Sequence, residues 1–335
     1  MGARPATPID LPALGAFVDD ALHRPSGVIG SVMPVPLTGG AIAGWKRILP
    51  AVLGLQGPLH VYVEEQAREL RSVAIVYGGT RPEWIVLALV ALPEPHGADA
   101  AFRLLSAVSA AAARRGLHRL FAAVPDPKAG APASVSLRSR ETFFQAGFYS
   151  YTRETWFVRA PSPADAPRDA VARPATRRDA HDLFRFYTTT TPHAVQRAEQ
   201  LSVPDFDIGH RGALDPPHLL GGNPFGLRRA GVLVAGDDLR TRAFAVGLRG
   251  VDRHPHACKI RTAEDDPALA RELVRAVAAE LPPGRPLASC VRSYEDHVAR
   301  ALVDEGFTEA ATAMLFVKEL AVRIEEPALA TAVVR

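Results

Sequence analysis

Residues 3 to 17, ARPATPIDLPALGAF, return without a gap at residues 172 to 186 as ARPATRRDAHDLFRF. In each copy a threonine stands three residues before an aspartate, which is the spacing of a helix-capping box. A capping box alone does not require the preceding Ala-Arg-Pro-Ala, or the later leucine and phenylalanine, to recur as they do here. The match therefore predicts an internal duplication of the chain.

A second repeated pattern marks the end of each copy. Residues 147 to 158, GFYSYTRETWFV, and residues 306 to 317, GFTEAATAMLFV, share Gly-Phe at the start and Phe-Val at the end. A chain of 335 residues is also longer than one hydrophobic core usually serves. The sequence therefore predicts a first domain over residues 1–158, a Pro- and Ala-rich linker over 159–171, a second domain over 172–323 and a C-terminal tail over 324–335.

The composition is that of an ordinary globular chain, with 47% hydrophobic and 22% charged residues. A net charge of +3 is too small an excess to predict a nucleic-acid partner, and two cysteines are too few for a disulfide scaffold. The longest apolar run, residues 84–92, is too short to span a bilayer but suits a strand buried on both faces. We therefore expect a cytoplasmic protein that binds neither nucleic acid nor membrane.

Local signals give both copies the same order of elements. In the first copy we expect a short strand and a helix that begins at Thr7, followed by strands near 59–65, 71–78 and 84–92, a helix capped by Asp99, a strand at 118–124, a helix at 135–146 and closing strands over 148–158. In the second copy we expect strands near 232–238, 240–249 and 256–262, and a helix that begins at Asp266. One strand–helix–strand crossover in each copy argues against a doubly wound dinucleotide fold, which needs several.

This order resembles that of the GNAT N-acetyltransferase superfamily, over nearly the whole chain and twice. The opening Arg-Pro-Ala-Thr-x-x-Asp and the closing Gly-Phe are similar to the entrances of the family's first helix and sixth strand. The resemblance implies an α/β (mixed α+β) fold of two tandem acyltransferase-like domains. It also implies acetyl-CoA or another acyl-CoA as co-substrate, and an amine or other small molecule as acceptor.

The family binds the CoA pyrophosphate at the N-terminus of the helix after its fourth strand, with the motif Q/R-x-x-G-x-G/A. The corresponding first-copy segment is His96-Gly97-Ala98-Asp99-Ala100-Ala101, in which only Ala101 fits. The cofactor-binding residues that the resemblance implies are Leu89, Ala91, His96, Gly97, Ala98, Asp99 and Ala101.

The second copy departs further from this motif, because Thr262-Ala-Glu264-Asp265-Asp266-Pro267 has no glycine and three carboxylates. We expect Asp99 and Asp266 to cap their helices and to occupy the N–H groups that a pyrophosphate would use. Any CoA binding is therefore expected in the first copy, and weak.

The family's usual general acid is a tyrosine four residues before the Gly-Phe glycine, where this chain has Phe143 and Leu302. Tyr149, Tyr151 and Tyr294 lie near the expected site and are alternative proton donors, or half-buried packing residues. The family's strand carboxylate corresponds to Glu83, which we take as the candidate catalytic base; the alternative is a solvated residue at a strand start.

Two further features have a functional and a plain interpretation. His254-Pro-His256-Ala-Cys258 has the spacing of metal ligands on one strand face, but no fourth ligand is evident and we expect no metal. The Gly- and Pro-rich residues 204–226 are either a substrate-binding segment or a surface excursion.

Two functions remain open from the sequence. The first is an acyl-CoA-dependent N-acyltransferase with weakened sites, its first copy being the CoA-binding one. The second is a catalytically silent tandem scaffold, a possible pseudoenzyme, that binds a small molecule or a protein partner.

Overall fold

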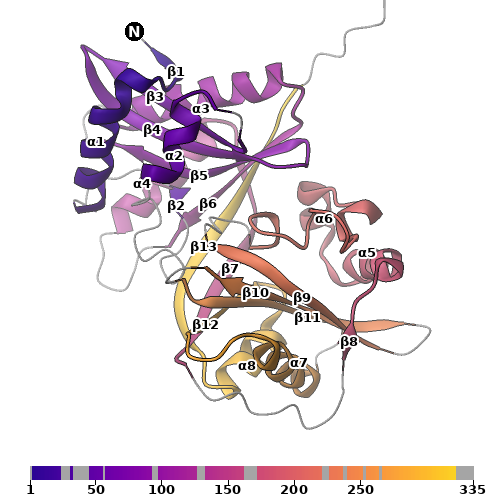
Figure 1. The fold of residues 1–335 in the computed structure, drawn as a ribbon. Coiled ribbons are helices and arrows are strands. Elements are labelled where there is room, and N and C mark those ends of the chain that lie inside the picture. Colours follow the sequence, from indigo (N-terminus) through magenta and orange to yellow (C-terminus); the bar gives the residue numbers. More distant parts are fainter. Residues whose placement is uncertain are drawn as a thin grey trace, which may run out of the picture.

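The computed structural model describes residues 2–23, 31–32, 45–55, 57–92, 97–126, 133–161, 172–220, 226–236, 240–251, 254–263 and 266–321. Their strands form one mixed sheet of 13 strands in the order β1-β3-β4-β5-β6-β13-β7-β12-β11-β10-β9-β8, with β2 paired to β5 off this path. Figure 1 shows the sheet running continuously through an upper, indigo-to-magenta half and a lower, orange half.

The first half follows the predicted order. Its elements are β1 (Ala3–Pro5), α1 (Leu11–His23), β2 (Ser31–Val32), α2 (Trp45–Val52), β3 (Leu59–Gln66), β4 (Glu69–Gly78), β5 (Glu83–Ala91), α3 (Gly97–Arg114), β6 (Arg119–Pro125), α4 (Ala133–Gln145) and β7 (Tyr149–Arg159). The three expected strands before α3 are confirmed to within a few residues.

Among the described elements, the second half repeats this plan without a counterpart of the short strand β2. Its elements are β8 (Arg173–Pro174), α5 (Ala180–Thr190), α6 (His193–Glu199), β9 (Leu227–Gly236), β10 (Thr241–Gly250), β11 (His256–Thr262), α7 (Pro267–Glu280), β12 (Leu287–Arg292), α8 (Asp296–Asp304) and β13 (Thr308–Glu319). Short 3₁₀ turns at Pro8–Asp10, Arg177–Asp179, Val203–Phe206 and His218–Leu220 complete the described elements.

The two halves exchange their last strands. β13 of the second half lies between β6 and β7, antiparallel to both, while β7 pairs on its other edge with β12 of the second half. In Figure 1 the yellow β13 crosses from the lower half into the upper one beside β7. The boundaries at 158 and 172 therefore separate the two copies in the sequence, but they do not separate two sheets, because a single sheet contains strands of both halves. Linker residues 162–171 and tail residues 322–335 lie outside the described part.

The exchange also corrects the expected closing strands. Residues 149–159 form one long strand where the sequence suggested more than one. A hairpin is not needed there, because the neighbouring strand on each side comes from the other half.

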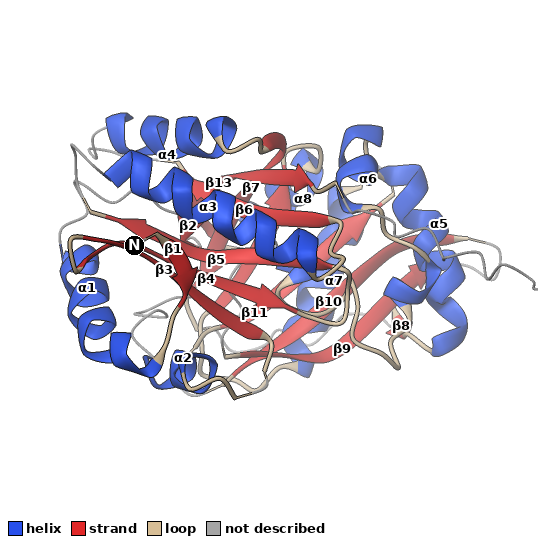
Figure 2. Cartoon of the chain, turned by 90° about the horizontal axis from the view of Figure 1, so that it is seen from above, coloured by secondary structure: helices blue, strands red, loops and turns tan. Residues whose placement is uncertain are grey.

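Helices cover both faces of the sheet, as Figure 2 shows from above. In the first half, α1 packs Leu14 and Phe17 on the face that carries Val61 and Ile75, and α3 packs Leu104 and Val108 on the opposite face. In the second half, α5 covers the face that carries Phe244, and α7 and α8 cover the other. Each half is thus an α/β layer with its own apolar core.

The duplicated opening motif makes the same contacts twice. Asp10 accepts hydrogen bonds from the Thr7 backbone N–H (2.7 Å) and from Arg4 (2.7 and 2.8 Å). Asp179 accepts the same bonds from Thr176 (2.6 Å) and Arg173 (2.6 and 3.0 Å). The arginine recurs because it neutralises the capping aspartate, which explains why more than the capping box is repeated.

The repeated Gly-Phe pattern also has a structural reason. Gly147 and Gly306 follow α4 and α8 with φ of +83° and +78°, a left-handed conformation that favours glycine at a helix end. The phenylalanines after them, Phe148 and Phe307, are buried in the cores of the two halves. The pattern therefore stops a helix and returns the chain to the core.

Candidate active site between the two halves

In the first half, the parallel strands β5 and β6 pair only at their beginnings. The register runs from Glu83↔Arg119 to Val86↔Ala122, although both strands continue to Ala91 and Pro125. We call the space beyond this last pair the first gap. Because β4 occupies the other edge of β5 along this stretch, β5 beyond Val86 presents its free edge to the first gap.

The short strand β2 lies on that edge. Ser31 pairs with Leu89, and Val32 pairs with Ala88, in antiparallel register. Since Leu89 already pairs with Ala74 of β4 on its other side, β2 must lie on the β6 side, inside the first gap. The chain itself therefore covers part of the free edge of β5.

Helix α3 begins next to the first gap, at Gly97 rather than at Asp99. A Cβ atom on Gly97 would stand 1.8 Å from the carbonyl oxygen of Leu92, so this approach of helix and strand requires glycine. Asp99 lies in the first turn, is exposed, and makes no hydrogen bond within the described residues. The expectation that Asp99 caps the helix is wrong, because the helix starts two residues earlier.

The other implied CoA-binding residues are placed as follows. Leu89, Ala91 and Ala101 are buried in the first-half core, and Ala98 is half-buried at the start of α3. His96 lies outside the described residues. Of these residues, Leu89 borders the first gap with its backbone, and Gly97 is the first residue of α3.

In the second half, β11 and β12 also diverge after three pairs, from His256↔Leu287 to Cys258↔Ser289. We call the space beyond these pairs the second gap. The Lys259 side chain crosses it, and its Nζ donates to the carbonyl oxygen of Cys290 at 3.1 Å. The second gap is therefore bridged by the protein's own side chain.

One buried carboxylate holds this bridge together. Glu295 accepts hydrogen bonds from Arg261 Nε (2.6 Å), from Lys259 Nζ (3.3 Å) and from the backbone N–H of Arg292 (3.0 Å). These three bonds come from β11 and from the end of β12, and we call the four residues the Glu295 lock. Burial alone would raise the pKa of Glu295, but the neighbouring Lys259 and Arg261 charges outweigh it and hold the pKa at about 2.

The helix after the second gap is capped as the sequence predicts. Asp266 accepts a hydrogen bond from the backbone N–H of Leu269 at 3.0 Å, and Arg242 lies 3.5 Å from its carboxylate. Pro267 at the first helical position has no N–H to offer. Few backbone N–H groups of this helix terminus therefore remain for a phosphate. The two other carboxylates of this segment, Glu264 and Asp265, lie outside the described residues.

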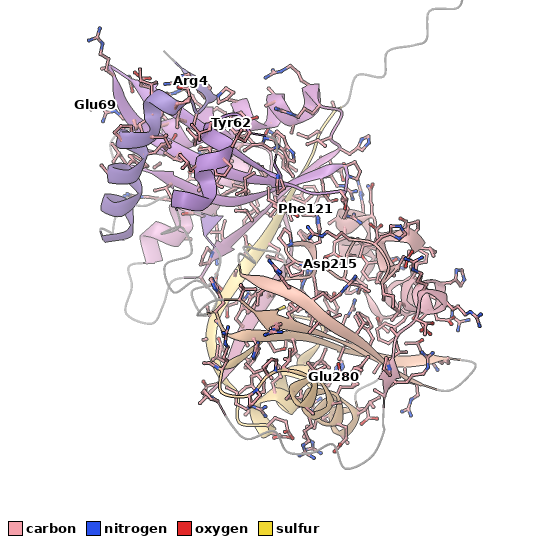
Figure 3. All side chains as sticks on the ribbon, in the orientation of Figure 1. Arg4, Tyr62, Glu69, Phe121, Asp215 and Glu280 are labelled. Atoms are coloured by element: carbon pink, nitrogen blue, oxygen red, sulfur yellow. The ribbon has the colours of Figure 1, made fainter. Side chains whose placement is uncertain are left out.

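A cavity of about 70 Å³ lies between the two halves. The first half contributes Glu83, Ile85, Phe121, Ala122 and Tyr151 to its wall. Ala122 is the last residue of β6 before the first gap opens, and Ile85 precedes the last paired residue of β5. The cavity therefore adjoins the mouth of the first gap; Figure 3 labels Phe121 where the two halves meet.

Glu83, the predicted base, lies in this cavity wall but is only 3% exposed. Arg81 donates to both of its oxygens at 2.7 and 3.1 Å, and His218 Nδ1 lies 3.0 Å from Oε1. Burial alone would raise the pKa of Glu83, but the hydrogen bonds from His218 and Arg81 outweigh burial and hold the pKa at about 2. The interpretation as a solvated strand start is wrong, because second-half residues cover this position.

The segment 204–226 provides that cover. Asp205 forms an ion pair with Arg81, Thr80 donates to the carbonyl oxygen of Arg211 at 3.1 Å, and His218 meets Glu83. Phe206 and Leu214 of this segment also line the cavity. Where it is described, this segment is a wall of the cavity and not a surface excursion; residues 221–225 lie outside the described part.

The candidate tyrosines separate into two groups. Tyr151 and Tyr294 line the cavity, and neither hydroxyl has a hydrogen-bond partner among the described residues. Burial raises the pKa of Tyr151 and of Tyr294. Tyr149 lies elsewhere, 38% exposed, and donates to Glu319 at 3.0 Å.

Phe143 and Leu302, at the family's tyrosine position, are fully buried in the two cores. They can supply packing but no proton.

Sequence reasoning missed the charged residues of the second-half wall, namely Glu199, Lys259, Arg261 and Arg292, and also Glu295, which binds two of them. A signal was present, since Lys259 is one of only four lysines in the chain and stands two residues from Arg261 on one strand face. From the sequence alone, a strand face with two cations is expected to be exposed to solvent, because the contact between the two halves is not evident.

The metal interpretation of 254–258 gains nothing from the structure. His256 uses both ring nitrogens, one with the Gly250 N–H and one with the Pro282 carbonyl oxygen, each at 2.9 Å. Within the described ranges, no three His, Cys, Asp or Glu side chains gather to hold a metal ion, and none of the helices is long and apolar enough to cross a membrane.

Solved structures with the same arrangement identify the fold. A tandem GNAT protein from the clavulanic acid biosynthesis pathway aligns over 96% of this chain and 99% of its own, with 13% identity and a TM-score of 0.50. A GCN5-related N-acetyltransferase from Sphaerobacter thermophilus aligns over 97% of both chains, also with 13% identity and a TM-score of 0.50. The chain has the tandem GNAT fold.

This confirms the fold class that the resemblance to the GNAT superfamily implied. No family model matches the sequence, and no curated protein matches it either. At 13% identity the tandem GNAT structures establish architecture alone, so the chemistry has to be argued from the site.

Proposed function

We propose that the chain is an acyl-CoA-dependent N-acyltransferase whose donor binds only in the first half and whose amine acceptor binds in the cavity between the halves. One observation carries this proposal: the cavity wall includes Ile85 and Ala122, at the mouth of the first gap. A thioester at the inner end of that gap would therefore reach the acceptor directly.

The first half fits a CoA donor in two respects. The free edge of β5 offers backbone N–H and C=O groups, with which the amides of a pantetheine arm can pair as a peptide strand does. The start of α3 offers N–H groups and a positive dipole end to a pyrophosphate, and Gly97 keeps that start close to the strand. Because β2 pairs with Leu89 and Ala88, the donor must displace β2, and we expect weak binding.

The cavity residues supply acid and base groups. The amine nitrogen attacks the thioester carbonyl, a C–N bond forms, the C–S bond breaks, and the thiolate leaves. We assign His218 to accept the amine proton and Glu83, held ionised, to orient the imidazole through Nδ1. Tyr151, whose hydroxyl has no partner among the described residues, lies in the cavity wall and gives its proton to the thiolate.

A silent scaffold is the second candidate, and the position of β2 favours it. If β2 stays paired with β5, the first gap is covered and neither half admits a donor. The cavity would then bind a small molecule without chemistry.

The experiment is to incubate the full chain with acetyl-CoA and a panel of small amines and to measure the release of CoA thiol. Tyr151→Phe should lower kcat about a hundredfold with little change in CoA affinity. Tyr149→Phe is the matched control, because that hydroxyl lies outside the cavity. Absence of turnover and of CoA binding by the folded protein would favour the scaffold.

A further inference from the structure

We propose that the second-half wall of the cavity is a carboxylate-binding site, formed by Lys259, Arg261, Arg292 and Tyr294. We call these four residues the carboxylate pole. All four line the cavity, and the three cations are each at most 7% exposed.

Each member of the pole has a hydrogen-bond donor that the protein leaves unused. Arg261 donates from Nε to Glu295 and from Nη2 to Thr190 and Thr191, and its Nη1 has no partner among the described residues. Arg292 donates from Nε to Glu154 and from Nη1 to Glu199, which leaves Nη2.

Lys259 and Tyr294 complete the set of unused donors. Lys259 has two acceptors, the Cys290 carbonyl and Glu295, for its three Nζ hydrogens. The Tyr294 hydroxyl has no partner in the described part, and its ring lies 5.7 Å from the Arg261 guanidinium. Such donors are met by water or by the acceptors of a ligand, and a carboxylate can meet several of them at once.

Each oxygen of the carboxylates in the cavity wall already accepts a hydrogen bond from the protein, and none of them is hydrogen-bonded to the unused donors of the pole. Glu199 accepts from Arg292 and from Tyr187, and Glu83 accepts from Arg81 and His218. The cavity therefore offers donors and few free acceptors, which is the chemistry of an anion site.

The charge balance favours an anion of one negative charge over a dianion. The basic groups in and around the cavity are Arg81, Arg119, Lys259, Arg261 and Arg292, and the acidic ones are Glu83, Glu154, Glu199, Asp205 and Glu295. These charges cancel, so a dianion such as phosphate would add two uncompensated charges to a buried site and a carboxylate only one. A planar carboxylate also matches the guanidinium groups of Arg261 and Arg292.

The cavity volume limits the size of the ligand. About 70 Å³ corresponds to roughly five to seven water positions, which suits a molecule as small as glycine or alanine. With its carboxylate at the pole, the other end of such a molecule points to the first-half wall. If the proposed function holds, the acceptor is therefore the amine of a small amino acid.

The test is a titration of the full chain, without CoA, with sodium acetate, glycine, methylammonium chloride and sodium chloride at equal ionic strength. Calorimetry measures binding, and thermal unfolding measures the shift in Tm. Acetate and glycine should bind and raise the Tm, whereas methylammonium and chloride should not. Tyr294→Phe, which removes an unused hydroxyl, should weaken acetate binding about tenfold. Tyr149→Phe should bind acetate as the native protein does.

The proposal fails if the folded native protein binds neither acetate nor glycine, or if Tyr294→Phe binds acetate with unchanged affinity. A protein that binds both carboxylates but transfers no acetyl group to glycine retains the carboxylate pole and loses only the acyltransferase assignment.

Discussion

The two halves treat the same opening in the sheet in different ways. In the first half the strands part after Val86 and Ala122, and the described strand β2 pairs through its backbone with β5 in the first gap. In the second half the strands part after Cys258 and Ser289, and the Glu295 lock ties them together across the second gap. A short strand is removable, but a buried network of ion pairs is part of the fold.

The comparison agrees with the proposal that donor and acceptor bind in different halves. In the second half the Lys259 side chain bridges the gap and Asp266 caps the following helix, while Lys259 and Arg261 line the shared cavity. The first half keeps a strand edge that a ligand can reach once β2 leaves. One half would then bind the donor and the other would select the acceptor.

The largest expected effect concerns the Glu295 lock. Glu295→Ala should lower the free energy of unfolding by about 3–5 kcal/mol, because Lys259 and Arg261 remain buried without their carboxylate. Urea denaturation at neutral pH measures the loss. Asp304→Ala, which breaks an exposed pair with Arg271, is the control and should cost less than about 1 kcal/mol. Equal losses in the two variants would mean that the lock does not hold the second gap.

Gly97→Ala should act on the first half alone. The added Cβ would collide with the Leu92 carbonyl, so α3 must move away from β5, at a cost of about 1–3 kcal/mol. CoA binding, measured by calorimetry, should fall by about tenfold or more. Asp266→Ala, which removes the second-half cap, should leave CoA affinity as it is. A variant at Gly97 with native CoA affinity would place the donor elsewhere.

The twin capping boxes should respond equally in the two halves. Asp10→Asn and Asp179→Asn should each lower the free energy of unfolding by about 1–2 kcal/mol at pH 7. The bonds from Arg4 and Arg173 lower the pKa of each aspartate from 3.8 to about 2. An aspartate whose pKa is lower in the folded than in the unfolded chain stabilises the fold at any pH above its unfolded pKa. This stabilisation is lost as the pH falls from about 4 to 2.

Urea denaturation at pH 7 and at pH 2 checks this pH dependence. The difference between native protein and each variant should shrink at the lower pH. A difference that stays constant, or that appears in one half only, would contradict the equivalence of the two motifs.

The smallest expected effect is on the charge near α3. Asp99→Gly should tighten CoA binding by roughly two- to fivefold, because it removes an exposed negative charge from a helix N-terminus. Asp266→Gly should change CoA affinity little, because the Glu295 lock still closes the second gap. Calorimetric titration of both variants with CoA measures these affinities. Tighter CoA binding by Asp266→Gly would assign the donor to the second half.

The fold was predictable because its signals are local and occur twice. Thr7 and Thr176, and the glycines before Phe148 and Phe307, specify helix ends that depend on neighbouring residues only. The strand exchange was not predictable, because β7 and β13 have the same apolar pattern whichever half they join.

The site was predictable only in part, for the same reason. Glu83, Tyr151 and Tyr294 were chosen by their place in the chain and do line the cavity. His218 and the residues of the Glu295 lock were not predicted, because the sequence does not show where the two halves pack together. The prediction that Asp99 caps α3 was wrong, because Gly97 allows the helix to begin two residues earlier. A capping pattern in the sequence does not reveal this close approach of helix and strand.

Hydrogen–deuterium exchange of the full chain, with and without saturating CoA, tests the central claim most directly. The account predicts weak binding, with a Kd of roughly tens to hundreds of micromolar, and added protection confined to peptides covering 83–101. Peptides covering 256–270 should exchange at the same rate in both samples. Protection of 256–270, or no change at 83–101 when CoA is bound, would contradict the assignment of the donor to the first half.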